Sequence, residues 1–180
     1  MKWAVFIWLL AAGMGVSCSI VTERQKKIRF LKEVEYSLRK LTYYMYQWRM
    51  PIKEAIYHMA REERGSFQSY YINLGEVLEA RQAEDFGKLW KEQSKALWKE
   101  EMREYLSLRT EGRYEEVRVL WEDAFMNLPM EVEELNRRLL FRMEDMKAHR
   151  AELEKKYKGE QKLVFAMGIF VSTFFCLIFW

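Results

Sequence analysis

The chain contains two apolar stretches without a charged residue, residues 3–22 and residues 163–180. A helix needs roughly 20 predominantly apolar residues to cross the hydrocarbon core of a bilayer. Both stretches approach that length. We therefore predict two transmembrane helices, over residues 3–22 and 163–180, with membrane lipid around them.

Between these stretches, residues 23–162 are strongly charged and long enough for one domain of ordinary size. The whole chain has only eight glycines and two prolines, which favours long helices over turn-rich β architecture. The predicted fold class is all-α: a multi-helix bundle, residues 23–162, flanked by two transmembrane helices.

Basic residues gather on the bundle side of both apolar stretches. They follow the first at Arg24, Lys26, Lys27, Arg29 and Lys32, and precede the second at Lys147, Arg150, Lys155, Lys156, Lys158 and Lys162. Positive residues that flank membrane helices stay in the cytoplasm. We expect a two-pass protein of the cell membrane, with both termini outside and the bundle in the cytoplasm.

The first apolar stretch has a second interpretation, as a lipoprotein signal peptide cleaved before Cys18. Lys2, the apolar run and the small residues Gly15, Val16 and Ser17 loosely fit such a signal. However, the position three before Cys18 is a glycine rather than a large aliphatic residue, and the basic residues that follow oppose translocation. Labelling or cleavage at Cys18 would favour the lipoprotein.

Small residues recur at a spacing of four in both apolar stretches, at Ala11 and Gly15 and again at Gly168 and Ser172. This spacing lets helices approach closely in lipid. If the two helices are antiparallel, Gly15 falls opposite Gly168. Ala11 then falls opposite Ser172. We predict a packed helical hairpin with these four as transmembrane packing residues, although small residues are common in membrane helices in any case.

The bundle should begin with a helix that has no breaker from Glu23 to Pro51. Its apolar residues alternate spacings of three and four, as in a coiled-coil seam. They are Leu31, Val34, Leu38, Leu41, Met45 and Trp48. Tyr43, Tyr44 and Tyr46 thicken this seam, and we favour core packing for these aromatic residues over a binding patch.

Five more helices are expected along the chain. One follows Pro51, one is capped by Ser66, one covers residues 85–108, and one follows Gly112. The last and longest begins at Pro129, and no internal proline stops it before the second apolar stretch. One of its faces carries Val132, Leu135, Leu139, Met143 and Met146.

Motifs for catalysis or cofactor binding are missing from the sequence. It has no phosphate-binding glycine loop and no nucleophile elbow. His58 follows Glu54 by four and His149 follows Asp145 by four, which is typical of solvated helix pairs rather than metal ligands. With 30 basic and 27 acidic residues, the chain also lacks the one-sided charge of a nucleic-acid binder. We expect no enzyme, cofactor or metal site.

The order of these segments carries a family resemblance. A basic stem leads into a helix rich in Leu and Tyr, after which residues 50–55 are Met-Pro-Ile-Lys-Glu-Ala. Leu89 and Trp90, the acidic helix near Pro129 and a final helix containing Gly168 continue the match. Over nearly its whole length the chain resembles the stage III sporulation protein AB family of endospore-forming bacteria, whose pattern at residues 50–55 is Thr-Pro-Leu-x-Glu-Ala.

The sequence departs from that family pattern in two places. Met50 replaces the usual threonine cap, which weakens that helix start by roughly 1 kcal/mol. Asn127, Leu128 and Pro129 stand where the family tends to have Leu-Gly and then Ser or Asp, so the turn there should differ.

The resemblance implies a function. The family is similar to the cytoplasmic helical domain of the F-type platform proteins of type II secretion and type IV pilus systems. The resemblance implies that this protein is a non-enzymatic platform component of the secretion-like channel from mother cell to forespore. It would lie in the outer forespore membrane and face the mother-cell cytoplasm. The implied partners are a cytoplasmic secretion-type ATPase and membrane ring proteins of the same complex.

A self-assembling helical membrane scaffold unrelated to secretion is the alternative. The highly charged residues 147–162 could serve such a homo-oligomer. In that case, the isolated bundle should associate with itself in a concentration-dependent way.

Overall fold

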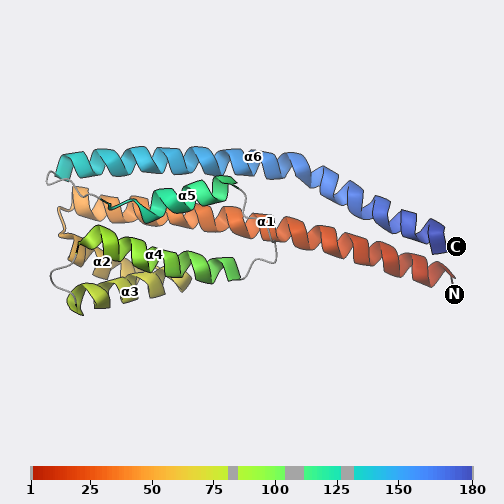
Figure 1. Ribbon diagram of the computed structural model, residues 1–180, viewed down its shortest axis with the longest axis horizontal. Coiled ribbons are helices and arrows are strands. Elements are labelled where there is room, and N and C mark those ends of the chain that lie inside the picture. Colours follow the sequence, from red (N-terminus) through yellow and green to blue (C-terminus); the bar gives the residue numbers. More distant parts are fainter. Residues whose placement is uncertain (1, 81–84, 104–111, 127–131, 180) are drawn as a thin grey trace. The chain divides into compact units, whose positions relative to one another are not determined.

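The computed structural model describes residues 2–80, 85–103, 112–126 and 132–179 (Figure 1). For residues 2–7, 9, 10, 100–103, 132 and 175–179 it describes the backbone only. The described residues form six helices and no strand, which confirms the all-α class. The helices are α1 (Lys2–Gln47), α2 (Ile52–Glu62), α3 (Gly65–Ala80), α4 (Phe86–Arg103), α5 (Gly112–Glu122) and α6 (Val132–Phe179).

These helices form two compact units. The terminal unit consists of Met1–Phe30 and Ala151–Trp180, and the bundle unit consists of Leu31–Arg150. Helices α1 and α6 contribute to both units. Within the described residues, no helix has a stretch long and apolar enough to cross a membrane, so the two transmembrane spans predicted from the sequence are not supported.

Helix α1 carries the predicted seam as far as its last turns. Leu31, Val34, Leu38 and Leu41 are all fully buried. The prediction was wrong for Trp48, which lies beyond the helix end at Gln47 and is 55% exposed. The chain turns there because Arg49 adopts a left-handed φ of 50°.

The later helix boundaries largely follow the sequence prediction. Helix α3 begins at Gly65, whose φ of 63° suits glycine, so Ser66 lies within the helix rather than before it. Helix α4 covers the first part of the predicted residues 85–108, and residues 104–108 lie outside the described part. Pro129 also lies outside it, but α6 continues without a break to Phe179, as predicted.

The core of the bundle unit is an aromatic cluster. Helices α2, α3 and α4 lie on one side of α1 in this unit, and α5 lies beside α6 (Figure 1). Trp90 of α4 is fully buried, and its ring centroid lies 4.8 Å from that of Trp121 and 4.5 Å from that of Phe125. Its Nε1 donates a hydrogen bond to the carbonyl of Trp121 at 2.7 Å. Gly87 lets α4 approach the backbone of Phe125 closely, since a Cβ there would lie 2.4 Å from the Phe125 carbonyl oxygen.

Candidate membrane and protein interaction surfaces

In the terminal unit, α1 and α6 pack through two reciprocal pairs of small residues. A Cβ added to Gly168 would lie 2.2 Å from Oγ of Ser17, and one added to Gly13 would lie 2.0 Å from Oγ of Ser172. The Ser17 hydroxyl lies within hydrogen-bonding distance of the carbonyls of Gly13, at 3.0 Å, and Val164, at 3.2 Å. Small side chains therefore set how closely the two helices approach.

The residues in this contact differ in part from those singled out in the sequence. Gly168 and Ser172 face α1, but Ala11 and Gly15 are exposed, and nothing lies within 4 Å of a Cβ added to Gly15. Positions two apart on a helix point to nearly opposite sides. The facing pair Gly13 and Ser17 has the same spacing of four as Ala11 and Gly15, so spacing alone did not identify the contact face.

The outward face of the terminal unit consists of large apolar side chains. These are Trp8, Met14, Val16 and Ile20 on α1, and Leu163, Met167, Ile169, Phe170, Val171 and Phe174 on α6. Among the described side chains of residues 8–22 and 163–174, the two buried ones are instead the hydroxyl-bearing Ser17 and Ser172. This arrangement is the reverse of a water-soluble helix pair, in which apolar side chains turn inward.

Charged residues follow the apolar residues on α1 and precede them on α6. The guanidinium of Arg24 contacts the carboxylate of Glu160 at 3.0 Å. It also lies over the ring of Tyr157, 5.0 Å from the centroid. Lys27 forms a further ion pair with Glu23 at 3.5 Å. The terminal unit thus has an apolar section followed by a charged one.

A second candidate surface lies at the C-terminal end of α1, in the bundle unit. Tyr43, Tyr46 and Trp48 each expose a large part of their surface, and we call these three the aromatic patch. Tyr44 is buried beneath, with its ring centroid 6.1 Å from that of Tyr43 and 5.3 Å from that of Trp48. The predicted core packing is therefore right for Tyr44 and wrong for the patch residues.

A polar cluster joins the base of this patch to α2. The Tyr44 hydroxyl donates a hydrogen bond to the Glu62 carboxylate at 2.5 Å, and this bond raises the pKa of Tyr44 to about 12. The same bond, together with Lys40, lowers the pKa of Glu62. Burial acts to lower the pKa of Lys40, but hydrogen bonds to Glu62 and Glu63 outweigh it and the pKa is raised. The charged forms of Lys40 and Glu62 are thus favoured together.

The two histidines, His58 and His149, contact different kinds of residue. The His58 ring packs 5.7 Å from that of Tyr44, between centroids. Nδ1 of His149 lies 2.9 Å from the carboxylate of Glu116 on α5, a contact between helices rather than the predicted pair with Asp145. In the described part of the chain, no three His, Cys, Asp or Glu side chains lie close enough together to hold a metal ion.

Comparison with protein families assigns the chain to one of them. The family model described as stage III sporulation protein AB matches residues 2–180, which is essentially the whole chain. The chain belongs to the stage III sporulation protein AB family. Comparisons with curated proteins and with solved structures gave no match. Membership in the stage III sporulation protein AB family confirms the resemblance found in the sequence and is consistent with a role in sporulation.

Proposed function

We propose that this protein is a non-enzymatic platform component of a membrane assembly between mother cell and forespore, and that it docks a cytoplasmic secretion-type ATPase to membrane ring proteins. The observation that carries this proposal is the outward apolar face of the terminal unit. The aromatic patch of the bundle unit supports the docking role.

Lipid is the environment that suits the terminal unit best. Exposing many large apolar side chains to water is unfavourable by about 25 cal/mol per Å² of apolar surface. Hydrocarbon removes this cost, but it requires that polar groups be satisfied inside the helix pair. The Ser17 and Ser172 hydroxyls meet this requirement, because each lies within hydrogen-bonding distance of a helix carbonyl. We propose that both ends of the chain insert in the membrane.

The charged section of the terminal unit supports a particular orientation. Arg24, Lys26 and Lys27 follow the apolar part of α1, and Lys158 and Lys162 precede that of α6. Positive residues remain on the cytoplasmic side. We therefore place both termini outside the mother-cell cytoplasm and the bundle inside it, with the outer forespore membrane as the location.

The aromatic patch offers the bundle a docking surface. Exposed tyrosine and tryptophan residues are enriched among the side chains that dominate binding energy at protein interfaces. Tyr43 and Trp48 are held by ring contacts with the buried Tyr44, so little side-chain entropy is lost when a partner binds. We propose that the ATPase binds here.

Topology reporters test the membrane part of this proposal. Reporters that are active only outside the cytoplasm would be fused at residue 1, inserted at residue 110 and fused after residue 180. We expect activity at both ends and none at residue 110. Activity at residue 110 would refute the platform function, because no cytoplasmic ATPase could then reach the bundle.

Site-specific cross-linking tests the docking part. A photoreactive amino acid would replace Trp48, with replacement of the similarly exposed Ile72 on α3 as the matched control. In sporulating cells, we expect Trp48 but not Ile72 to yield a cross-link to the secretion-type ATPase. Cross-links from Trp48 only to other copies of this chain would instead favour the self-assembling scaffold.

A further inference from the structure

Basic residues outnumber acidic ones beside the apolar section of the terminal unit. Residues 23–29 of α1 and residues 154–162 of α6 contain eight basic and three acidic residues. The whole chain has a net charge of +3, so these two segments carry more than the entire positive excess. Positive charge is therefore concentrated next to the apolar section rather than spread over the protein.

Each of the three carboxylates in these segments already has a basic partner. The ion pairs are Glu160 with Arg24 at 3.0 Å, and Glu23 with Lys27 and Glu154 with Lys158, both at 3.5 Å. The acidic side chains are thus neutralised inside the segments. They leave other basic side chains without a counter-charge.

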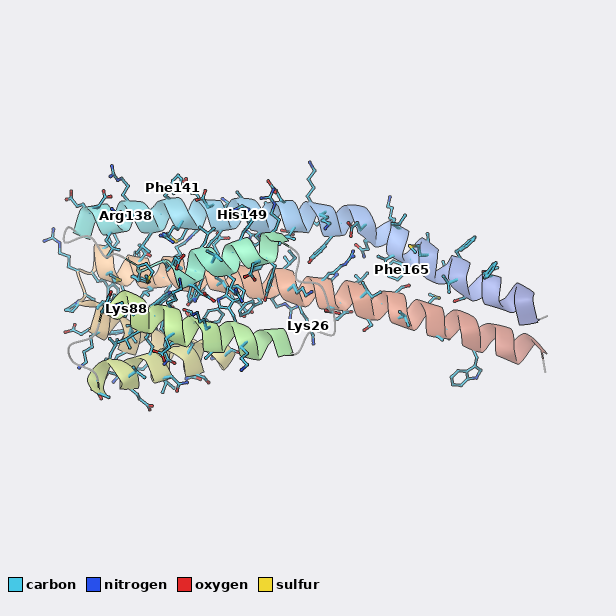
Figure 2. All side chains as sticks on the ribbon, viewed as in Figure 1. Lys26, Lys88, Arg138, Phe141, His149 and Phe165 are labelled. Carbon is cyan, nitrogen blue, oxygen red and sulfur yellow. The ribbon has the colours of Figure 1, made fainter. Side chains whose placement is uncertain are left out.

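Four basic side chains in these segments are exposed and have no carboxylate partner among the residues that the structure describes. We call these four the basic collar; they are Lys26, Arg29, Lys155 and Lys162. Figure 2 shows Lys26 on the side of α1 that points away from α6. An outward charge at this level meets the surroundings of the helix pair rather than the other helix.

The basic collar lies close to the level at which the apolar section ends. Lys162 directly precedes the apolar stretch of α6, and Lys155 lies seven residues, or about 10 Å, before it. Lys26 and Arg29 follow the apolar stretch of α1 by four and seven residues, or about 6 and 10 Å. The headgroup region of a bilayer is about 5–8 Å thick on each side. Because long basic side chains extend their charge away from the backbone, all four can reach the headgroups of surrounding lipids.

We propose that the basic collar binds the headgroups of anionic phospholipids in the cytoplasmic leaflet. Clusters of about four to eight Lys and Arg residues on the cytoplasmic side of a membrane helix typically bind anionic lipids. A lipid fits better than a soluble phosphate, because the exposed apolar face beside the collar can hold the acyl chains of the same molecule. The inference rests on the proposed insertion of the terminal unit in the membrane, and it adds which lipids surround that unit.

Electron spin resonance tests this lipid preference on the full chain, reconstituted in phosphatidylcholine vesicles. A spin-labelled lipid whose acyl chain touches the protein is motionally restricted, so the restricted fraction measures its association with the chain. We expect spin-labelled phosphatidylglycerol to associate about fivefold more strongly than spin-labelled phosphatidylcholine, as for one basic side chain per headgroup. The preference should fall toward one in about 1 M salt, because salt screens the attraction.

Neutral variants identify the side chains responsible. The collar variant combines Lys26→Gln, Arg29→Gln, Lys155→Gln and Lys162→Gln, and it should reduce the preference to near one. Glutamine removes the charge but has a similar helix propensity. The matched control replaces four exposed lysines of the bundle unit by glutamine, namely Lys53, Lys88, Lys95 and Lys99. It changes the net charge by the same amount and should keep the preference, while circular dichroism checks the helix content of both variants.

The outcomes separate this inference from the proposed function. Equal restriction of both spin-labelled lipids would overturn lipid binding by the collar and leave membrane insertion intact. An equal loss of preference in the control variant would also overturn it, since net charge would then be the cause. If neither lipid were restricted at all, insertion of the terminal unit would itself be refuted.

A soluble competitor tests whether the ligand is a lipid. Glycerol phosphate would be added to the vesicles while the ionic strength is held constant. We expect no change in the preference for phosphatidylglycerol, because the soluble molecule has no acyl chains to contact the apolar face. Loss of the preference at millimolar glycerol phosphate would show that the collar binds a soluble phosphate and would overturn the proposal.

Discussion

The side chains of Glu35 and Arg150 form an ion pair although 115 positions separate them in the chain. Nε and Nη2 of Arg150 both lie 3.1 Å from Oε2 of Glu35. The two side chains are 11% and 15% exposed, so the pair is largely shielded from water and joins α1 to α6 within the bundle unit. The other carboxylate oxygen accepts a hydrogen bond from Arg39, whose side chain is 61% exposed.

Loss of Arg150 should destabilise the bundle more than loss of Arg39. Arg150→Ala leaves a mostly buried carboxylate with one exposed partner, so we expect the free energy of unfolding to fall by about 2 kcal/mol. Arg39→Ala removes the exposed partner and should cost less than about 1 kcal/mol. Urea denaturation followed by circular dichroism measures both. Equal losses would show that burial of the pair is unimportant.

Two glycines on α1 should respond differently to an added methyl group. A Cβ at Gly13 would lie 2.8 Å from the carbonyl oxygen of Gly168, and backbone cannot move aside cheaply. Gly13→Ala should therefore loosen the helix pair by about 1–3 kcal/mol, whereas Gly15→Ala has open space and should not. Faster hydrogen exchange of residues 11–22 and 163–174 in micelles would report the loosening. The same exchange rates in both variants would contradict the packing seen here.

Removing the Tyr44 hydroxyl should change how stability depends on pH. Its pKa is raised from 10.0 to about 12, so its stabilising contribution is complete below pH 10 and is lost as the pH rises toward 12. Tyr44→Phe should cost about 1 kcal/mol at neutral pH, because the half-exposed Glu62 is partly screened by water. It should also make the alkaline decline shallower.

Part of that alkaline decline should remain in the Tyr44 variant. Burial raises the pKa of Tyr70 and of Tyr71, so both oppose ionisation in the folded state in the same sense. Tyr43→Phe is the matched control, since Tyr43 is half-exposed and next to Tyr44. Denaturation curves at several pH values would measure both variants. If Tyr43→Phe changed the alkaline slope as much as Tyr44→Phe, the bond to Glu62 would not be the cause.

Two tryptophans provide a test of where the bundle core lies. Trp90→Phe removes a hydrogen bond and leaves a cavity, so it should lower the free energy of unfolding by about 3 kcal/mol. Trp48→Phe alters an exposed side chain and should cost less than about 0.5 kcal/mol. Thermal unfolding of both variants is the measurement. A large cost for Trp48 would place it in the core, against the aromatic patch as a docking surface.

Helix periodicity was enough to predict most of the bundle unit. Leu31, Val34, Leu38 and Leu41 were assigned to the buried seam because their spacing matches one face of a helix, and all four are fully buried. The pattern failed at Trp48 because the helix ends at Gln47 and the chain turns at Arg49, which takes a positive φ. The apolar spacing in the sequence extends past the end of the helix, so its last residue is not buried.

Contacts between distant helices could not be predicted in the same way. Ser17 meets Val164, and Glu35 meets Arg150, because of the register of α1 against α6. A spacing of four fits Ala11 and Gly15 as well as it fits Gly13 and Ser17, so the sequence could not choose between two nearly opposite faces. The side chains that interlock decide this, and they become visible only in three dimensions.

The pairing of α1 with α6 also determines the order in which the chain can fold as it is synthesised. Helices α2, α3 and α4 contact their neighbours in sequence, so they can pack as soon as they leave the ribosome. Ser17 must wait for a partner 147 residues later, and Glu35 for one 115 residues later. Contacts this distant form slowly. The newly made α1 therefore stays without its last partner for most of translation, and in this period its exposed apolar residues are most liable to aggregate.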